Sequence, residues 1–158
     1  MRGLLVALLG CWWIFGAVAT VVNIPGLGKV RGTTTNLGKS RRFLGIKYGK
    51  QPTGNRRFAP PEPYAPWNGT MDATSFGPDC MQDNVSSSSP GFQVPVSEDC
   101  LYLNIYTPSA MAKRSANGWP VLLWLFGGGF TEGGGNETRL NGSWVVDYLL
   151  PDLSLIHI

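Results

Sequence analysis

Three consecutive glycines, Gly127-Gly128-Gly129, are the residues of this sequence whose type and spacing best suit chemistry. They directly follow an unbroken apolar run, Val121 to Phe126. Because glycine has no β-carbon, a ligand can approach its backbone closely and positive φ angles are accessible. Such a loop has two chemical uses. Its N–H groups can cradle a phosphate, or they can stabilise negative charge on a reacting carbonyl oxygen, as an oxyanion hole does.

The phosphate patterns do not fit this loop. A G-x-G-x-x-G pattern that starts at Gly127 ends on Glu132, and one that starts at Gly133 ends on Thr138. The P-loop pattern fails because it needs a lysine that this segment lacks. An oxyanion hole is therefore the preferred interpretation, and a plain tight turn stays open as the alternative.

Histidine, the commonest general base, occurs only once, as the penultimate residue His157. Histidine chemistry in the body of the chain is therefore excluded, and we assign His157 no catalytic role. We expect no metal site and no cofactor.

The first 19 residues have the layout of a secretory signal peptide. Arg2 gives the positive start, Leu4 to Phe15 is an apolar run, and Ala17-Val18-Ala19 offers a cleavage site. We expect a secreted, extracellular chain that begins near Thr20. An uncleaved anchor is the less favoured alternative, because the apolar run is shorter than the ~20 residues that span a bilayer. No stable membrane span is therefore expected.

The cysteines agree with export. Removal of the signal removes Cys11 and leaves Cys80 and Cys100, an even number in an oxidising compartment. One disulfide is expected, which would close a loop of about twenty residues and stabilise the fold by ~3 kcal/mol. Two free buried thiols are the alternative.

Glycosylation sequons also agree with export. The N-x-[ST] pattern without a central proline occurs four times in turn-rich sequence. The candidate acceptors are Asn68, Asn84, Asn136 and Asn141, of which the last two lie close enough to compete.

The composition is that of a folded chain with no strong electrostatic partner. It has 158 residues, is 43% hydrophobic and carries a net charge of +3 from scattered basic residues. A nucleic-acid groove or a polybasic membrane patch is therefore not expected. The composition does not indicate an oligomeric state.

Two strands and a coat are expected in the first half. Residues 29–35 and 42–48 alternate and predict an antiparallel hairpin with a turn at 36–39. The prolines of segment 51–78 exclude a continuous helix there. Aromatic residues recur through the segment, which predicts that it is ordered and covers the hydrophobic core. These aromatics are Phe58, Tyr64, Trp67 and Phe76. Residues 85–91, rich in serine, predict a flexible loop inside the disulfide ring.

Two further strands and a helix are expected after residue 100. Residues 100–106 alternate, which predicts a half-buried strand that Pro108 ends. Residues 121–126 are uniformly apolar and too few for a helix, which predicts a strand buried on both faces. Residues 143–150 predict a short helix that Asn141 or Ser143 caps.

Several motifs together resemble one family. Residues 98–108, Glu-Asp-Cys-Leu-Tyr-Leu-Asn-Ile-Tyr-Thr-Pro, look like the E-D-C-L-x-L-N signature of type-B carboxylesterases. This α/β-hydrolase family includes cholinesterases and fungal lipases. Phe43-Leu44-Gly45-Ile46-Lys47-Tyr48 resembles its F-x-G-I-P-Y motif, with Lys47 as a departure. Arg57-Phe58, Phe76-Gly77-Pro78 with Cys80 and Gln82, and the glycine triplet with Phe130 continue the likeness, which covers about residues 28–136.

The resemblance implies a fold, an activity and site residues. The fold would be α/β, the incomplete N-terminal part of an α/β-hydrolase with an opening hairpin, a disulfide-closed loop and the first core strands. The family's oxyanion donors map onto Gly128 and Gly129, and its N-terminal disulfide onto Cys80 and Cys100. The substrate would be a small-molecule or lipid ester. Phe126, where many members have histidine, favours lipase-like relatives.

The family's catalytic triad is missing from these 158 residues. No G-x-S-x-G elbow occurs, and His157 comes too early for the family's order of serine, acid and histidine. We therefore interpret the chain as a signal peptide (1–19), the N-terminal portion of a carboxylesterase domain (20–150) and an atypical tail (151–158). Truncation of the sequence or a shift of the reading frame would explain the tail. The chain alone should be inactive. A non-catalytic adhesion or binding relative with the same fold is the alternative, and a short secreted product that binds esters without turnover is a third.

Overall fold

The computed structural model describes residues 19–35, 38–82, 95–109, 116, 118–136, 141–149 and 153–158. The strands are β1 (Ala19–Ile24), β2 (Gly28–Thr34), β3 (Ser40–Lys47), β4 (Thr70–Asp72), β5 (Asp79–Cys80), β6 (Val96–Ser97), β7 (Tyr102–Pro108), β8 (Val121–Trp124) and β9 (Ser154–His157). The helical segments are the 3₁₀ turn η1 (Gly54–Arg56), α1 (Gly142–Trp144) and the π-helical turn η3 (Val145–Leu149).

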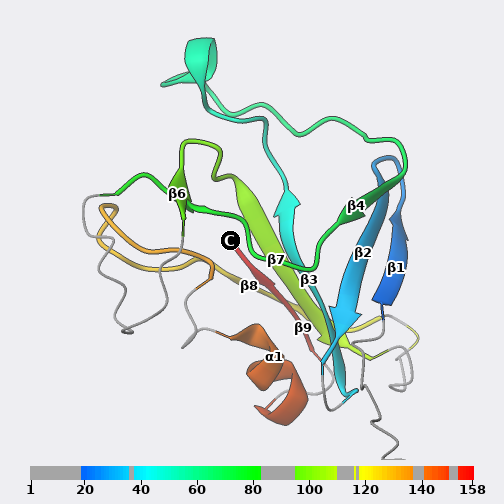
Figure 1. Ribbon diagram of the computed structural model, residues 1–158. Helices are drawn as coiled ribbons and strands as arrows, with labels where there is room; N and C mark the ends of the chain where they lie inside the picture. The colour runs from blue at the N-terminus through cyan, green and yellow to red at the C-terminus, as the bar shows by residue number, and fades with distance from the viewer. Residues whose placement is uncertain are drawn as a thin grey trace, which may run out of the picture.

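One seven-stranded sheet organises the described residues. Its order is β1-β2-β3-β7-β9-β8, with β4 paired beside β2. Neighbours from β1 to β9 run antiparallel, whereas β8 and β9 run parallel. Figure 1 shows β1 and β2 at one side of this sheet and α1 at another. The fold is the incomplete N-terminal part of an α/β-hydrolase, as the resemblance implied.

The predicted hairpin is confirmed. β2 and β3 pair antiparallel, with Thr33 opposite Arg42, and residues 36–37 of the connecting turn lie outside the described residues. β1 adds a third antiparallel strand that the sequence analysis did not predict. Its six residues pair along their full length with β2, so the opening unit is a three-stranded sheet.

Two apolar clusters form the core, one on each face of β3. Phe43 and Leu44 follow one another in β3 and therefore point to opposite faces of the sheet. Phe43 packs with Val30, Ile46 and Ala73. Leu44 belongs to the second cluster, whose other buried members are Tyr106, Val146 and Leu155.

The strand predicted over residues 100–106 is confirmed as β7, and its burial alternates from residue to residue, but the prediction is wrong about which face is the more buried. Leu103 and Ile105 are partly buried against the first cluster. On the other face Asn104 and Tyr106 are buried, because the end of the glycine loop lies against Asn104 and the helical turns pack on Tyr106. Both faces are therefore packed, and the more closed face carries the polar residues.

The prediction that residues 121–126 form a strand buried on both faces is also wrong. The strand β8 ends at Trp124, and all four of its residues are exposed. β8 is the edge strand of the described sheet, with β9 as its partner, and its side chains are exposed because the described residues leave both of its faces uncovered. β9 comes from the tail, and Leu155 and His157 are buried in it.

The proline-rich segment 51–78 covers the hydrophobic core only in part. Tyr64 and Trp67 are half-buried, and Trp67 packs against the first cluster. Phe58 is fully exposed, which corrects the prediction that it covers a core. Its backbone has a φ of 60°, and the segment around η1 projects away from the sheet (Figure 1).

The predicted helix is present, but it is irregular. Three α-helical residues lead into five π-helical ones, and Val146 from the second turn packs into the core. Asn141 is the cap, because its side chain accepts a hydrogen bond from Ser143 N at 3.0 Å. Among the described residues no helix is long and apolar enough to cross a bilayer.

Candidate functional site

The glycine triplet begins where β8 leaves the sheet. Hydrogen bonds continue the parallel pairing past the strand: Ile158 N donates to Trp124 O at 3.0 Å, and Phe126 N donates to Ile158 O at 3.4 Å. The loop therefore starts from a fixed point at the end of β8, which is the position at which α/β sheets place their ligands.

The loop folds back on the carbonyl of Gly128. Thr131 N and Glu132 N both donate to this oxygen at 3.1 Å, and Thr131 Oγ1 donates to it at 3.2 Å. In a trans peptide the N–H points opposite to the C=O. Since the Gly128 carbonyl faces the inside of the turn, the N–H of Gly129 faces away from it.

The same geometry orients the N–H of Gly128. A β-carbon built on Gly133 would overlap Gly127 O, so the Gly127 carbonyl lies against Gly133. The N–H of Gly128 belongs to the same peptide and therefore points away from Gly133. Among the described residues, neither Gly128 N nor Gly129 N has a partner. Two adjacent N–H groups are thus available to an external acceptor, which is what an oxyanion hole requires.

Glycine is required at two positions of this loop. Gly128 has a φ of 137°, and a β-carbon there would overlap Glu132 O. Gly133 has a φ of 116° and lies against both Gly127 O and the ring of Phe126. Gly129 has a φ of 61°, and a β-carbon there would meet only Thr131 Oγ1, at an ordinary contact distance of 4.0 Å. The adjoining Phe130 also has a positive φ, 64°, and is fully exposed.

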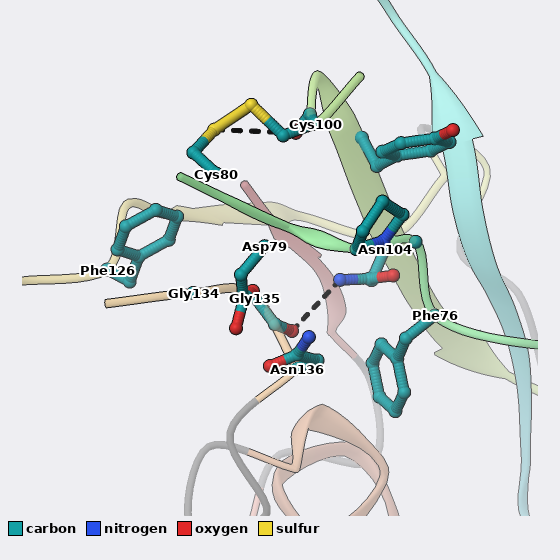
Figure 2. A pocket seen from close by; sticks show the side chains of 12 residues that line it. Phe76, Asp79, Cys80, Cys100, Asn104, Phe126, Gly134, Gly135 and Asn136 are labelled. Carbon is teal, nitrogen blue, oxygen red and sulfur yellow. Dashed lines mark hydrogen bonds between the residues drawn. A yellow bond between two sulfur atoms is a disulfide. The ribbon is translucent and has the colours of Figure 1, made fainter. Parts of the chain in front are cut away.

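Two amide side chains that the sequence analysis did not single out for a role hold the end of the loop. Gln82 bonds both backbone groups of Gly133: its Oε1 accepts from N at 2.9 Å, and its Nε2 donates to O at 3.1 Å. Asn104 donates from Nδ2 to Gly135 O at 3.0 Å, as Figure 2 shows. Its Oδ1 accepts from Gly45 N at 3.0 Å. Both residues lie in the motifs of the resemblance, which was the available signal.

The predicted disulfide between Cys80 and Cys100 is confirmed, with a Cα–Cα distance of 4.9 Å (Figure 2). It joins β5 to the residue two positions before β7. The predicted flexible segment 85–91 lies outside the described residues. The disulfide fixes one end of the segment that carries Gln82.

A small hollow lies between the disulfide and the end of the glycine loop. Its volume is ≈ 30 Å³, room for about two waters. Figure 2 shows Asp79, Asn104 and Asn136 around it, with Phe76 and Phe126 on opposite sides. It is far smaller than the ~300–1,000 Å³ of a typical ligand pocket. This hollow beside the glycine loop is therefore too small to be a substrate pocket of that kind.

The predicted glycosylation sites differ in exposure. Asn68 and Asn141 are exposed, and Asn84 lies outside the described residues. Asn136 is only 5% exposed, and its amide lies inside the fold. A glycan on Asn136 would require its buried side chain to become exposed to solvent. Of the two neighbouring sequons, the one at Asn141 is therefore the more accessible for glycosylation.

His157 is fully buried in β9, in register with Asn104 on one side and Trp124 on the other. Its ring meets that of Phe126 edge-on, with 6.4 Å between centroids. A side chain with no exposed surface does not reach a substrate above the glycine loop. The structure thus gives no reason to assign it a catalytic role.

A charged cluster stabilises the turn into the disulfide. Asp99 Oδ2 accepts hydrogen bonds from Lys47 Nζ at 2.7 Å, Gln51 Nε2 at 2.6 Å and Tyr102 OH at 3.0 Å. Burial lowers the pKa of Lys47, but the bonds to Asp99 and Tyr102 outweigh it and raise the pKa. Lys47, the departure from the family motif, thus has a local partner.

The chain is similar to known carboxylesterases. The model of the carboxylesterase family matches residues 18–152. Carboxylesterase 1D of Rattus norvegicus is 38% identical over an alignment of 143 residues, and the match covers 77% of this chain and 25% of that protein. Acetylcholinesterase of Bungarus fasciatus is 44% identical over an alignment of 128 residues, and the match covers 75% of this chain and 20% of that protein. A solved PNB esterase superposes with a TM-score of 0.73 at 36% identity, covering 86% of this chain and 26% of that one. The chain thus spans about a quarter of the length of these relatives.

Proposed function

The chain belongs to the carboxylesterase family, and from this premise we propose that the complete protein hydrolyses carboxylic esters with Gly128 and Gly129 as oxyanion donors. The observation that carries the proposal is the pair of N–H groups without a partner among the described residues. They face away from a turn that closes on the Gly128 carbonyl. The substrate is a small-molecule or lipid ester, and Phe126 before the triplet supports a lipase-like preference.

The two glycines stabilise the negative charge of the transition state and take no part in making or breaking covalent bonds. When a nucleophile attacks an ester carbonyl, negative charge develops on the carbonyl oxygen, and preformed N–H donors stabilise it. One such donor is worth roughly 10²–10³ in rate. Because the loop is held by its own hydrogen bonds and by Gln82, the donors need no reorganisation as the charge appears.

We propose that this chain alone does not turn over substrate. It contains no G-x-S-x-G sequence to supply a serine nucleophile, and its single histidine is fully buried. Donors without a nucleophile leave the ester intact. The N-terminal signal pattern, the disulfide and the exposed sequon asparagines Asn68 and Asn141 support secretion of the protein.

The test compares the complete protein with the chain. The complete transcript should encode a G-x-S-x-G elbow downstream, and the purified product should hydrolyse p-nitrophenyl butyrate with sensitivity to a serine-directed inhibitor. Residues 20–158 alone should give no hydrolysis above buffer. A complete protein in which another residue replaces the elbow serine, and which binds without turnover, would instead identify a binding relative and refute the proposal.

A further inference from the structure

The side-chain amide of Gln82 forms hydrogen bonds with both backbone groups of one residue of the glycine loop, Gly133. It accepts from Gly133 N at 2.9 Å and donates to Gly133 O at 3.1 Å, so one planar group binds both backbone groups of one residue. Its Nε2 also donates to Cys80 O at 3.2 Å. The contact therefore links the glycine loop to the disulfide-anchored strand, 51 residues earlier in the sequence.

Gly133 transmits this contact to the proposed donors. Its α-carbon lies against Gly127 O and against the ring of Phe126, so tightly that a β-carbon would overlap both. The Gly127 carbonyl and the Gly128 N–H belong to the same rigid peptide plane. A displacement of Gly133 therefore reorients the Gly128 N–H.

We propose that Gln82 is a positioning residue for the oxyanion hole: it holds Gly133, and through Gly133 it sets the direction of the Gly128 N–H group. This inference rests on the proposed function. Gln82 itself touches no reacting atom. One of the two hydrogen bonds is accepted by the Gln82 amide and the other is donated by it. Together they fix the distance between Gln82 and the Gly133 backbone and the orientation of that backbone, whereas a single bond fixes only the distance. Figure 2 shows that the next residues, Gly134 and Gly135, continue beside Asp79 and Asn104.

The first experiment measures kinetics in the complete enzyme. Gln82→Met keeps the length of the side chain and removes both hydrogen bonds. Because a misplacement of about 1 Å can cost 10²-fold in rate, we expect kcat to fall by about 10- to 100-fold. KM should change by less than about threefold, since the donors act mainly in the transition state. The matched control is Gln51→Met, which removes an exposed hydrogen bond to Asp99 and should leave kcat unchanged.

The second experiment uses protonation to restore the contact. In Gln82→Glu the carboxylate can accept from Gly133 N but repels Gly133 O, whereas the protonated acid can accept and donate as glutamine does. The ratio of kcat for Gln82→Glu to wild type should therefore rise at least about threefold as pH falls from about 7.5 to about 5, toward the pKa of glutamic acid. The same ratio for Gln82→Met should stay flat, which a general loss of folding would not produce.

Hydrogen exchange separates the inference from the proposed function. In the complete protein, the Gly133 N–H should lose at least about tenfold of its protection in Gln82→Met but not in Gln51→Met, whether or not the protein is an esterase. If esters are hydrolysed and kcat of Gln82→Met equals wild type, the positioning role is refuted. If no ester is hydrolysed while exchange at Gly133 changes as expected, the proposed function fails and the contact stands.

Discussion

Replacement of Gly128 by alanine tests the geometry of the proposed oxyanion loop most directly. A β-carbon at Gly128 would overlap Glu132 O, and the residue has a φ of 137°. The loop can give way at Glu132, which breaks the bond from Glu132 N to Gly128 O and displaces the two bonds that Thr131 donates to the same oxygen, at about 1 kcal/mol each. Alternatively, Gly128 can change its φ, which turns its N–H. Either route costs about 2–3 kcal/mol and moves at least one donor.

The assay is ester hydrolysis by the complete enzyme. Since one donor is worth roughly 10²–10³ in rate, Gly128→Ala should lower kcat at least about 100-fold with a small change in KM. Gly129→Ala is the matched control, because its β-carbon would overlap nothing and would meet only Thr131 Oγ1 at 4.0 Å. It retains its N–H and pays only a left-handed backbone penalty of about 1–2 kcal/mol. Equal kcat values for Gly128→Ala and wild type would refute the reasoning. A larger loss in Gly129→Ala than in Gly128→Ala would do the same.

Three further outcomes are expected in the complete protein. Asn104→Leu removes two buried hydrogen bonds of 3.0 Å, which should lower the free energy of unfolding by about 3–5 kcal/mol in denaturant titrations; a loss below about 1 kcal/mol would contradict the contact. Replacing Cys80 and Cys100 by serine should lower the free energy of unfolding by about 3 kcal/mol. It should also reduce the protection of the Gly133 N–H from hydrogen exchange; unchanged protection would show that the disulfide does not hold the loop. Burial raises the pKa of Tyr106 to about 12, so the folded state favours the neutral phenol. Stability should therefore fall from about pH 10 to about 12, and Tyr106→Phe should show a smaller decline, since burial also raises the pKa of Tyr48 and Tyr102; an identical pH profile in the variant would refute the assignment.

Local patterns were sufficient for the features that depend on neighbouring residues. The alternation at 29–35 and 42–48 predicted β2 and β3, and residue type and position narrowed the helix cap to Asn141 or Ser143, of which the structure has Asn141. The count of cysteines after export predicted the disulfide, and the glycine triplet identified the loop. These features are encoded in short segments, because backbone propensity and residue chemistry act over a few residues.

Burial could not be predicted in the same way. Residues 121–126 have the composition of a strand covered on both faces, yet β8 is an exposed edge. The alternation at 100–106 indicated which residues share a face but not that the face of Asn104 and Tyr106 would be the more buried one. Phe58 follows the same rule, since an aromatic residue is covered only where another element reaches it.

The sequence by itself determined the chemistry this chain can offer: a glycine loop with backbone donors, a pair of cysteines, and neither a serine elbow nor an available histidine. Only the tertiary structure decided which way the donors point and what holds them. Gln82 and Gly133 are 51 residues apart, and their contact exists because the disulfide and the sheet bring β5 beside the end of the loop after β8. A sequence pattern specifies the residues of a site, whereas their relative orientation depends on long-range contacts that close only in the folded chain.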